Sequence, residues 1–145
     1  MLAVAVPVAS AEEPPTKQQI IDRSAGICRD MLEAAAPHLE RAREAADRDK
    51  LERFIRESRR AIDAVRQVEP DLKDLVPPTG GRIYRRFVRH GRAGLDRLDA
   101  ALDALEQRRV RLAKERRRSA LEHFERARRA ARRYGLRRSC IRLLS

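Results

Sequence analysis

The chain has 145 residues, enough for one domain with a single core; 42% of them are hydrophobic but only 3% are aromatic. This aliphatic composition, with no strand-like alternation, argues against an aromatic β-sandwich and predicts an all-α fold. The net charge is +12, and it is uneven: residues 1–81 carry 13 Lys/Arg against 15 Asp/Glu, whereas residues 82–145 carry 21 against 7. The C-terminal half is therefore a polycation attached to a nearly neutral half.

The N-terminal residues resemble the end of a signal peptide. A short apolar run, Leu2–Val8, precedes Ala9-Ser-Ala11, and small residues at these spacings suit a signal peptidase. Because a basic start is missing, we interpret residues 1–11 as a signal-peptide remnant whose start codon lies upstream. Residues 12–15 are then a short linker and residues 16–145 one helical-bundle domain. This predicts a secreted or extracytoplasmic protein; the alternative is the unstructured tail of a cytosolic protein.

The first helix is expected to begin at Thr16, which has capping-box spacing to Gln19. Apolar residues then recur every three or four positions from Ile20 to Ala35, and Cys28 lies within this buried stripe. Pro37 is expected to end or bend the helix, because proline lacks the N–H that an interior helical position uses.

A second helix is expected after a charged connector at residues 40–50. Its apolar face runs from Leu51 to Val68, and Pro70 is expected to stop it. Residues 71–81 contain two prolines and two glycines in close succession and are interpreted as a loop, with room for one helical turn.

The helical pattern resumes at Arg82, and no glycine or proline lies between Gly94 and Gly135. The apolar stripe loses its phase in this segment, so we expect a turn within residues 107–118 and a fourth helix that ends at Tyr134. Gly135 suits the left-handed residue that follows such a helix. The chain therefore predicts a monomeric, antiparallel up-down four-helix bundle. The alternative is one coiled-coil helix over residues 82–134 that oligomerises.

Cys28 and Cys140 are the only two cysteines. In the bundle, the tail after Gly135 can turn back over the first helix near Cys28, which predicts one disulfide and supports an oxidising compartment. Two unpaired thiols, one buried and one exposed, are the alternative.

Three segments carry a resemblance to a known group of proteins: Ala25-Gly-Ile-Cys28, Pro77-Pro78 and the ending Ala130–Cys140. Together they resemble uncharacterised, secreted small helical proteins of GC-rich, actinobacterial-type bacteria, which share a first-helix Cys and a Gly-Leu-x-x-x-Cys ending. The resemblance implies export, a helical bundle and Cys28–Cys140 as a structural pair. It implies no chemistry.

No pattern of catalytic residues, metal ligands or phosphate-binding glycines is recognisable, so we expect a protein that is not an enzyme, has no cofactor and has no evident small-molecule substrate. His38, His90 and His123 are far apart in the sequence. The acidic residues at positions 96, 99 and 103 are interpreted as a solvated face that forms salt bridges with Arg92 and Arg97.

The basic residues of the C-terminal half are the remaining candidates for function, because guanidinium groups pair well with phosphate and carboxylate. One further cluster at helical spacing is formed by Arg82, Arg85, Arg86 and Arg89. An exported protein would meet anionic lipid or cell-wall polymer first; the alternative is a cytosolic Arg-rich protein that binds nucleic acid non-specifically. A GC-rich genome would also produce this arginine excess without selection for any ligand. The candidate polyanion-binding residues are Arg108, Arg109, Arg111, Lys114, Arg116, Arg117, Arg118, Arg126, Arg129 and Arg133.

Overall fold

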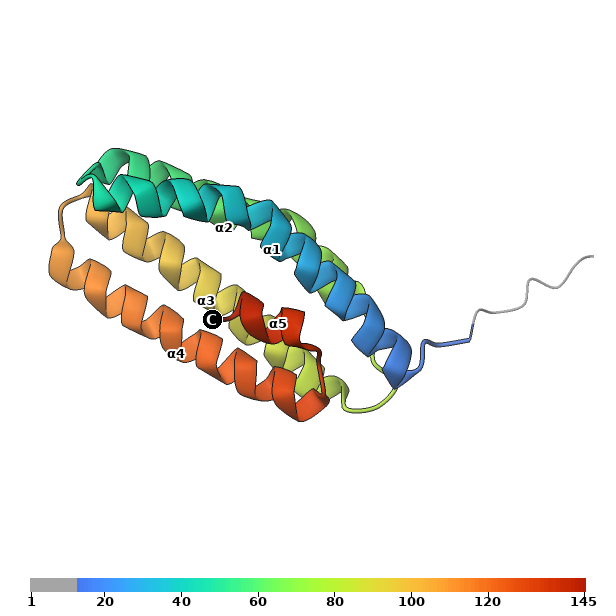
Figure 1. The fold of residues 1–145 in the computed structure, drawn as a ribbon. Helices are drawn as coiled ribbons and strands as arrows, with labels where there is room; N and C mark the ends of the chain where they lie inside the picture. The colour runs from blue at the N-terminus through green and yellow to red at the C-terminus, as the bar shows by residue number, and fades with distance from the viewer. Residues whose placement is uncertain (1–12) are drawn as a thin grey trace, which may run out of the picture.

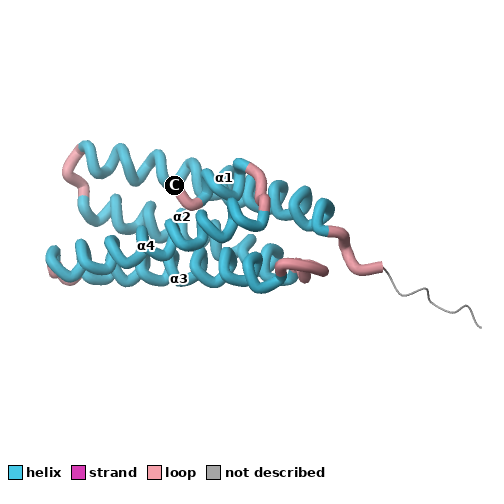
Figure 2. Tube along the Cα trace, turned by 90° about the horizontal axis from the view of Figure 1, so that it is seen from below, coloured by secondary structure: helices cyan, strands magenta, loops and turns pink. Residues whose placement is uncertain are grey.

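The computed structural model describes residues 13–145, so the proposed signal-peptide remnant at residues 1–11 lies outside the described residues. The described part contains five helices and no strand: α1 (Lys17–Asp47), α2 (Leu51–Asp74), α3 (Gly81–Glu106), α4 (Val110–Tyr134) and α5 (Arg138–Leu143). The four long helices pack side by side, and their connections lie at the two ends of the molecule (Figures 1 and 2). The predicted all-α four-helix bundle is confirmed, with α5 as an additional short helix.

The helix ends follow the local sequence. The Gln19 backbone N–H donates to Thr16 Oγ1 at 3.2 Å, and the Thr16 N–H donates to Gln19 Oε1 at 2.9 Å, which is the expected capping box. Gly135 has a φ of +93° and closes α4, as expected for a left-handed cap. Residues 107–109 connect α3 to α4, so the single long helix over residues 82–134 does not form.

Neither proline ends its helix, so the expected stop at Pro70 was wrong, as was the first of the two alternatives for Pro37, an end or a bend. Pro37 lies inside α1, which continues to Asp47 and includes most of the expected connector, and Pro70 lies inside α2. Both prolines are exposed, so water can solvate the carbonyl that each leaves without an N–H partner. Buried residues beyond each proline continue the apolar stripe, and their burial favours the longer helices: Ala42 and Ala45 in α1 and Leu72 in α2.

The apolar residues form two clusters. We call the first the clasped end; its buried members are Ile20, Cys28, Met31, Leu72, Tyr84, Phe87, Ala127, Ala130, Ala131, Tyr134, Leu136, Cys140 and Leu144. We call the second the open end; it centres on Ile55, Ile62 and Leu102. The clasped end therefore contains most of the buried core.

The predicted disulfide between Cys28 and Cys140 is present at the clasped end, with both residues fully buried and their Cα atoms 5.0 Å apart. It attaches α5 to α1. Two further bonds fix α5: the Ser139 hydroxyl donates to the Ala25 carbonyl at 3.0 Å, and Arg128 of α4 donates to the Leu144 carbonyl at 2.7 Å. The short helix is therefore held between α1 and α4 (Figure 1).

The bundle is not closed on all four sides. Helix α1 packs along α2, α2 along α3, and α3 along α4, but no Cα atoms of α1 and α4 lie within 8 Å of each other. Helix α5 contacts both α1 and α4 and fills part of the space between them. The rest of the α1–α4 side leads into an apolar cavity. None of the helices within residues 13–145 has the length and hydropathy to cross a bilayer.

Candidate anion-binding site

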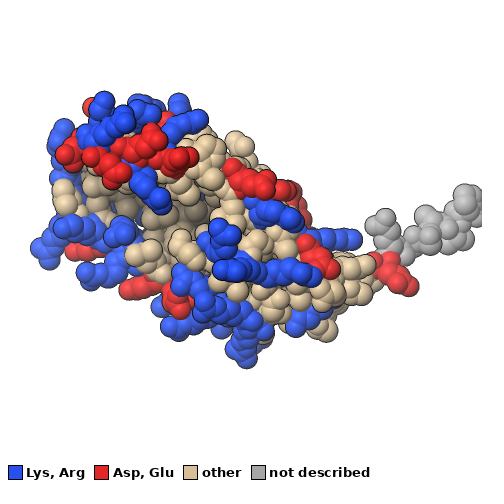
Figure 3. All heavy atoms as spheres, in the orientation of Figure 1, with Lys and Arg blue, Asp and Glu red and all other residues tan. Residues whose placement is uncertain are grey.

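The α3–α4 hairpin presents the strongest concentration of positive charge. Small residues allow its two helices to approach closely: a Cβ at Gly94 would lie only 2.4 Å from the Phe124 ring. The buried face of α4 is mostly alanine, at positions 113, 120, 127, 130 and 131. Because this narrow face is small and apolar, the arginines of α4 are left on the remaining faces, and Lys and Arg side chains gather along the lower part of the molecule (Figure 3).

Some of these arginines meet arginines of α3 across a groove of about 420 Å³, which we call the basic groove. Its lining from α3 is Ile83, Arg86, Arg89 and His90, and its lining from α4 is Arg126, Arg129, Ala130 and Arg133. All five arginines are exposed. The groove therefore combines three of the predicted polyanion-binding residues with two members of the α3 cluster.

Few carboxylates neutralise the basic groove. Glu125 accepts a hydrogen bond from Arg129 at 3.4 Å, but it also accepts a shorter one from Arg128, at 2.8 Å. The other four groove arginines have no carboxylate within 4.0 Å among residues 13–145. Five planar, permanently charged donors in one concave surface suit phosphate or carboxylate groups, which guanidinium can bind in bidentate fashion.

Two histidines join the helices at this groove. His90 Nδ1 and His123 Nδ1 are 3.1 Å apart, so one nitrogen must donate and the other, unprotonated, must accept. Burial lowers the pKa of His90, and His123, Arg89, Arg126 and Arg86 lower it further by charge repulsion. The sequence distance between the two residues had hidden this pair. A bound anion would offset the repulsion from the arginines.

The other predicted polyanion-binding residues lie elsewhere. Arg108 and Arg109 form the turn between α3 and α4, and Arg111 faces solvent beside Glu115. Arg116 donates to the Ala100 carbonyl at 3.0 Å, which gives it a structural role between the helices. Lys114 and Arg117 border the apolar cavity. Arg118 is exposed and lines neither the groove nor the cavity.

The acidic face of α3 forms salt bridges, but its partners belong to α2. Arg66 contacts both Asp96 and Asp99, at 2.8 and 3.1 Å. Asp103 and Glu106 are held by Arg59 in the same way. The expected salt-bridged face is therefore present, with arginines of α2 in place of Arg92 and Arg97. These partly exposed pairs bring α2 and α3 together with a modest contribution to stability.

Within residues 13–145, no cluster of three or more His, Cys, Asp or Glu side chains could hold a metal ion. No protein-family model, curated protein or solved structure matches the chain. Its functional interpretation therefore depends on the chemistry of its own surfaces, of which the basic groove brings five exposed arginines of two helices together.

Proposed function

We propose that this protein is a non-enzymatic, extracytoplasmic helical bundle that binds anionic components of the cell envelope through its basic groove. The observation that carries the proposal is that five exposed arginines from α3 and α4 line one groove. Among residues 13–145, only one of them, Arg129, has a carboxylate partner, Glu125, which it shares with Arg128. Single arginines on a helix surface are ordinary, but convergence from two helices into one concave site creates a focused positive potential.

Two features support the extracytoplasmic location. A disulfide between Cys28 and Cys140 persists most readily in an oxidising compartment, and Ala9-Ser-Ala11 suits cleavage on export. Such a protein meets anionic lipid headgroups and cell-wall polymers before it meets nucleic acid. N-terminal sequencing of protein recovered from its host tests export directly; an intact N-terminus in the cytosolic fraction contradicts it.

The groove is tested by binding to phosphatidylglycerol vesicles, with phosphatidylcholine vesicles as the uncharged comparison. Each basic residue near an anionic surface contributes about 1 kcal/mol, so Arg126→Ala/Arg133→Ala is expected to weaken binding about 30-fold. The matched control is Arg118→Ala/Arg132→Ala, which removes the same charge from exposed positions on the same helix outside the groove. Binding should also weaken as salt is added, because ions screen surface charge.

Equal losses in the two double variants would mean that net charge acts without the groove, and would contradict the assignment of the site. Cell-wall polymer tested in parallel distinguishes the two envelope ligands. Binding of DNA or RNA without binding to vesicles or wall polymer would overturn the proposal in favour of the nucleic-acid alternative.

The same assay has a predicted pH dependence. Because Arg86, Arg89, Arg126 and His123 disfavour protonation of His90, an anion in the groove should raise its pKa. Binding an anion then takes up a proton, so vesicle affinity should increase as the pH falls from about 7 to about 5. Replacement of His90 by Gln should reduce this increase in affinity and leave the affinity at neutral pH unchanged. An unchanged pH profile would contradict the role given to His90.

A further inference from the structure

A second candidate site shares no lining residue with the basic groove. It is the apolar cavity reached through the α1–α4 side, with a volume of about 500 Å³. This volume lies within the range of small-molecule binding pockets. In Figure 3 the opening is visible as a hollow with uncharged walls between the charged side chains of the two hairpins. We call this cavity the cleft.

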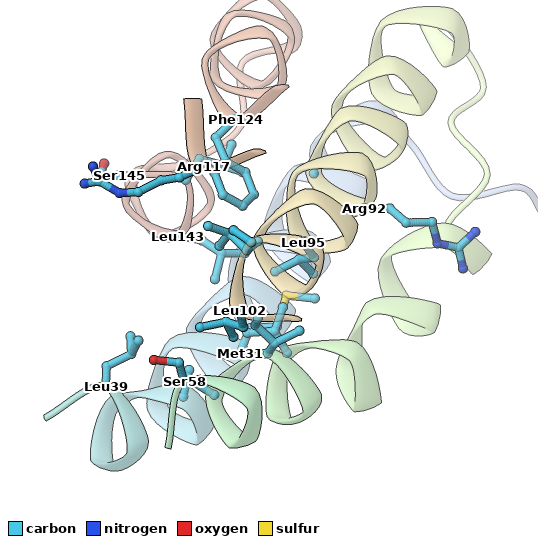
Figure 4. Close-up of a pocket in the computed structure, with 18 of the residues that line it drawn as sticks. Met31, Leu39, Ser58, Arg92, Leu95, Leu102, Arg117, Phe124, Leu143 and Ser145 are labelled. Carbon is cyan, nitrogen blue, oxygen red and sulfur yellow. The ribbon is translucent and has the colours of Figure 1, made fainter. Parts of the chain in front are cut away.

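All five helices contribute walls to the cleft, and those walls are almost entirely aliphatic or aromatic. Met31, Leu95 and Leu102 point toward one another inside it, whereas Arg92 points away (Figure 4). Arg92 instead pairs with Glu69 of α2 at 3.2 Å. The interior therefore offers few hydrogen bonds and favours a ligand that is apolar over most of its length.

The shape of the cleft restricts the ligand further. Its wall on α3 extends from Phe87 to Leu105, which at 1.5 Å per residue is a length of about 27 Å. An elongated apolar space of this length suits a chain-like ligand better than a compact one. A single hydrocarbon chain, whose carbons pack about 4 Å from their neighbours, fits.

The mouth of the cleft is positively charged. Lys114 and Arg117 of α4 and Arg142 of α5 are exposed and line the cleft. None of the three has a carboxylate within 4.0 Å in the described part of the chain. Two exposed apolar residues also line the cleft: Leu39 of α1 and Val110 of α4 are 54% and 53% exposed. An apolar cleft with unpaired cations at its mouth is complementary to a chain that ends in an anion.

We infer that the cleft binds one long-chain fatty acid, with the hydrocarbon chain between the two hairpins and the carboxylate beside Lys114, Arg117 and Arg142. This binding is separate from the proposed association through the basic groove, because the two sites share no lining residue. The tests are therefore independent: Arg126→Ala/Arg133→Ala, which removes groove charge, should leave fatty-acid binding unchanged.

The test uses the fluorescent fatty acid cis-parinaric acid and its displacement by palmitate. The blocking variant is Gly91→Leu, since Gly91 lines the cleft and a Cβ there would meet only Leu144, at 4.0 Å. The new side chain should fill part of the cleft and weaken palmitate binding about tenfold or more. The matched control is Gly26→Leu in α1, where a Cβ would meet only Arg29, at 3.9 Å, outside the cleft. Should Gly91→Leu fail to fold, Ser58→Phe blocks the cleft from α2.

The carboxylate site is tested by Lys114→Ala/Arg117→Ala, which should weaken binding of palmitate but not of palmityl alcohol, whose head is neutral. The control is Arg118→Ala/Arg132→Ala, with the same loss of charge away from the mouth. The inference is overturned if palmitate does not displace the probe, if Gly26→Leu weakens binding as much as Gly91→Leu, or if the alcohol binds wild-type protein as tightly as the acid. Self-association that Gly91→Leu abolishes would assign the cleft to a second copy of this chain and would also overturn it.

Discussion

The clasped end and the open end of the bundle are built from the same long helices, yet they bury apolar residues in different ways. At the clasped end α5 occupies the space between α1 and α4, and the rings of Tyr84 and Tyr134 pack edge to face with centroids 5.5 Å apart. At the open end that space has no helix in it, and Leu39 and Val110 remain more than half exposed. The same apolar stripes therefore pack around α5 at one end and line the cleft at the other, and the cleft also reaches Met31, Leu72 and Phe87 of the clasped end.

From this difference we predict that burial and stability are concentrated at the end where α5 fills the space between α1 and α4. A clasped-end residue that does not line the cleft, such as Ile20, has neighbours on every side, whereas a residue that lines the cleft borders empty space and forgoes those contacts. We therefore expect the open end to contribute less to the free energy of folding than the clasped end. Four measurements test this comparison, from the largest expected effect to the smallest.

Removal of the disulfide should have the largest effect. The bridge joins residues 112 positions apart, and the double variant Cys28→Ala/Cys140→Ala is expected to lose about 4–5 kcal/mol of unfolding free energy, mainly because the unfolded chain gains freedom. Urea unfolding of the wild-type and double-variant proteins measures the difference. A loss below about 1 kcal/mol would show that the packing of α5, without its covalent bond, holds the clasped end together.

A matched pair of isoleucines compares the two ends directly. Ile20 is fully buried at the clasped end, whereas Ile62 is 6% exposed and borders the cleft. Truncation of a buried Ile to Ala costs about 2–5 kcal/mol, and we expect Ile20→Ala near the top of this range and Ile62→Ala near the bottom. Chemical denaturation of both variants tests the order; a larger loss at Ile62 would contradict the assignment of stability to the clasped end.

The two buried tyrosines at the clasped end offer a finer test. The Tyr84 hydroxyl donates to the Leu72 carbonyl at 2.7 Å, whereas the Tyr134 hydroxyl has no hydrogen-bond partner among the described residues. Tyr84→Phe should therefore cost about 1–1.5 kcal/mol, and Tyr134→Phe should be neutral or slightly stabilising. Thermal melts of the two single variants are sufficient, and equal losses would show that the hydrogen bond from Tyr84 to Leu72 contributes no more to stability than the unpaired Tyr134 hydroxyl.

The smallest effect is expected at the mouth of the open end. Leu39→Ser and Val110→Ser change residues that are already largely hydrated, so each should alter the unfolding free energy by less than about 0.5 kcal/mol. A loss of more than about 2 kcal/mol would mean that these side chains are buried in solution, and therefore that the open end closes.

Local signals in the sequence were sufficient for most of the fold. The capping box at Thr16, the left-handed Gly135 and the phase change before α4 each depend on a few neighbouring residues, so the sequence predicted them. The disulfide was predictable because Cys28 and Cys140 are the chain's only cysteines. Whether the helices end at Pro37 and Pro70 was not predictable in this way. The free-energy cost of a proline inside a helix depends on whether the carbonyl that loses its N–H partner reaches water, and the local sequence pattern does not show this.

The two candidate sites were harder to predict, because each depends on distances between helices. The arginines of α3 and α4 were recognised as separate clusters, but their meeting at one groove requires the crossing of the two helices. His90 and His123 are 33 positions apart and gave no local signal. The cleft arises because no other helix of the described chain covers part of the apolar stripes. The periodicity of the sequence predicts an apolar stripe but does not predict whether another helix packs against it.

The placement of the disulfide also determines how the molecule responds to a cut in its backbone. Cys28 belongs to the α1–α2 hairpin and Cys140 to the segment that contains α3, α4 and α5, while residues 75–80 are the only stretch of main chain between them. A protease that cleaves this stretch leaves two fragments joined through sulfur. The cleaved protein would migrate as one species on a non-reducing gel and as two after reduction. The cleavage of the backbone is therefore detected only after a thiol has reduced the disulfide.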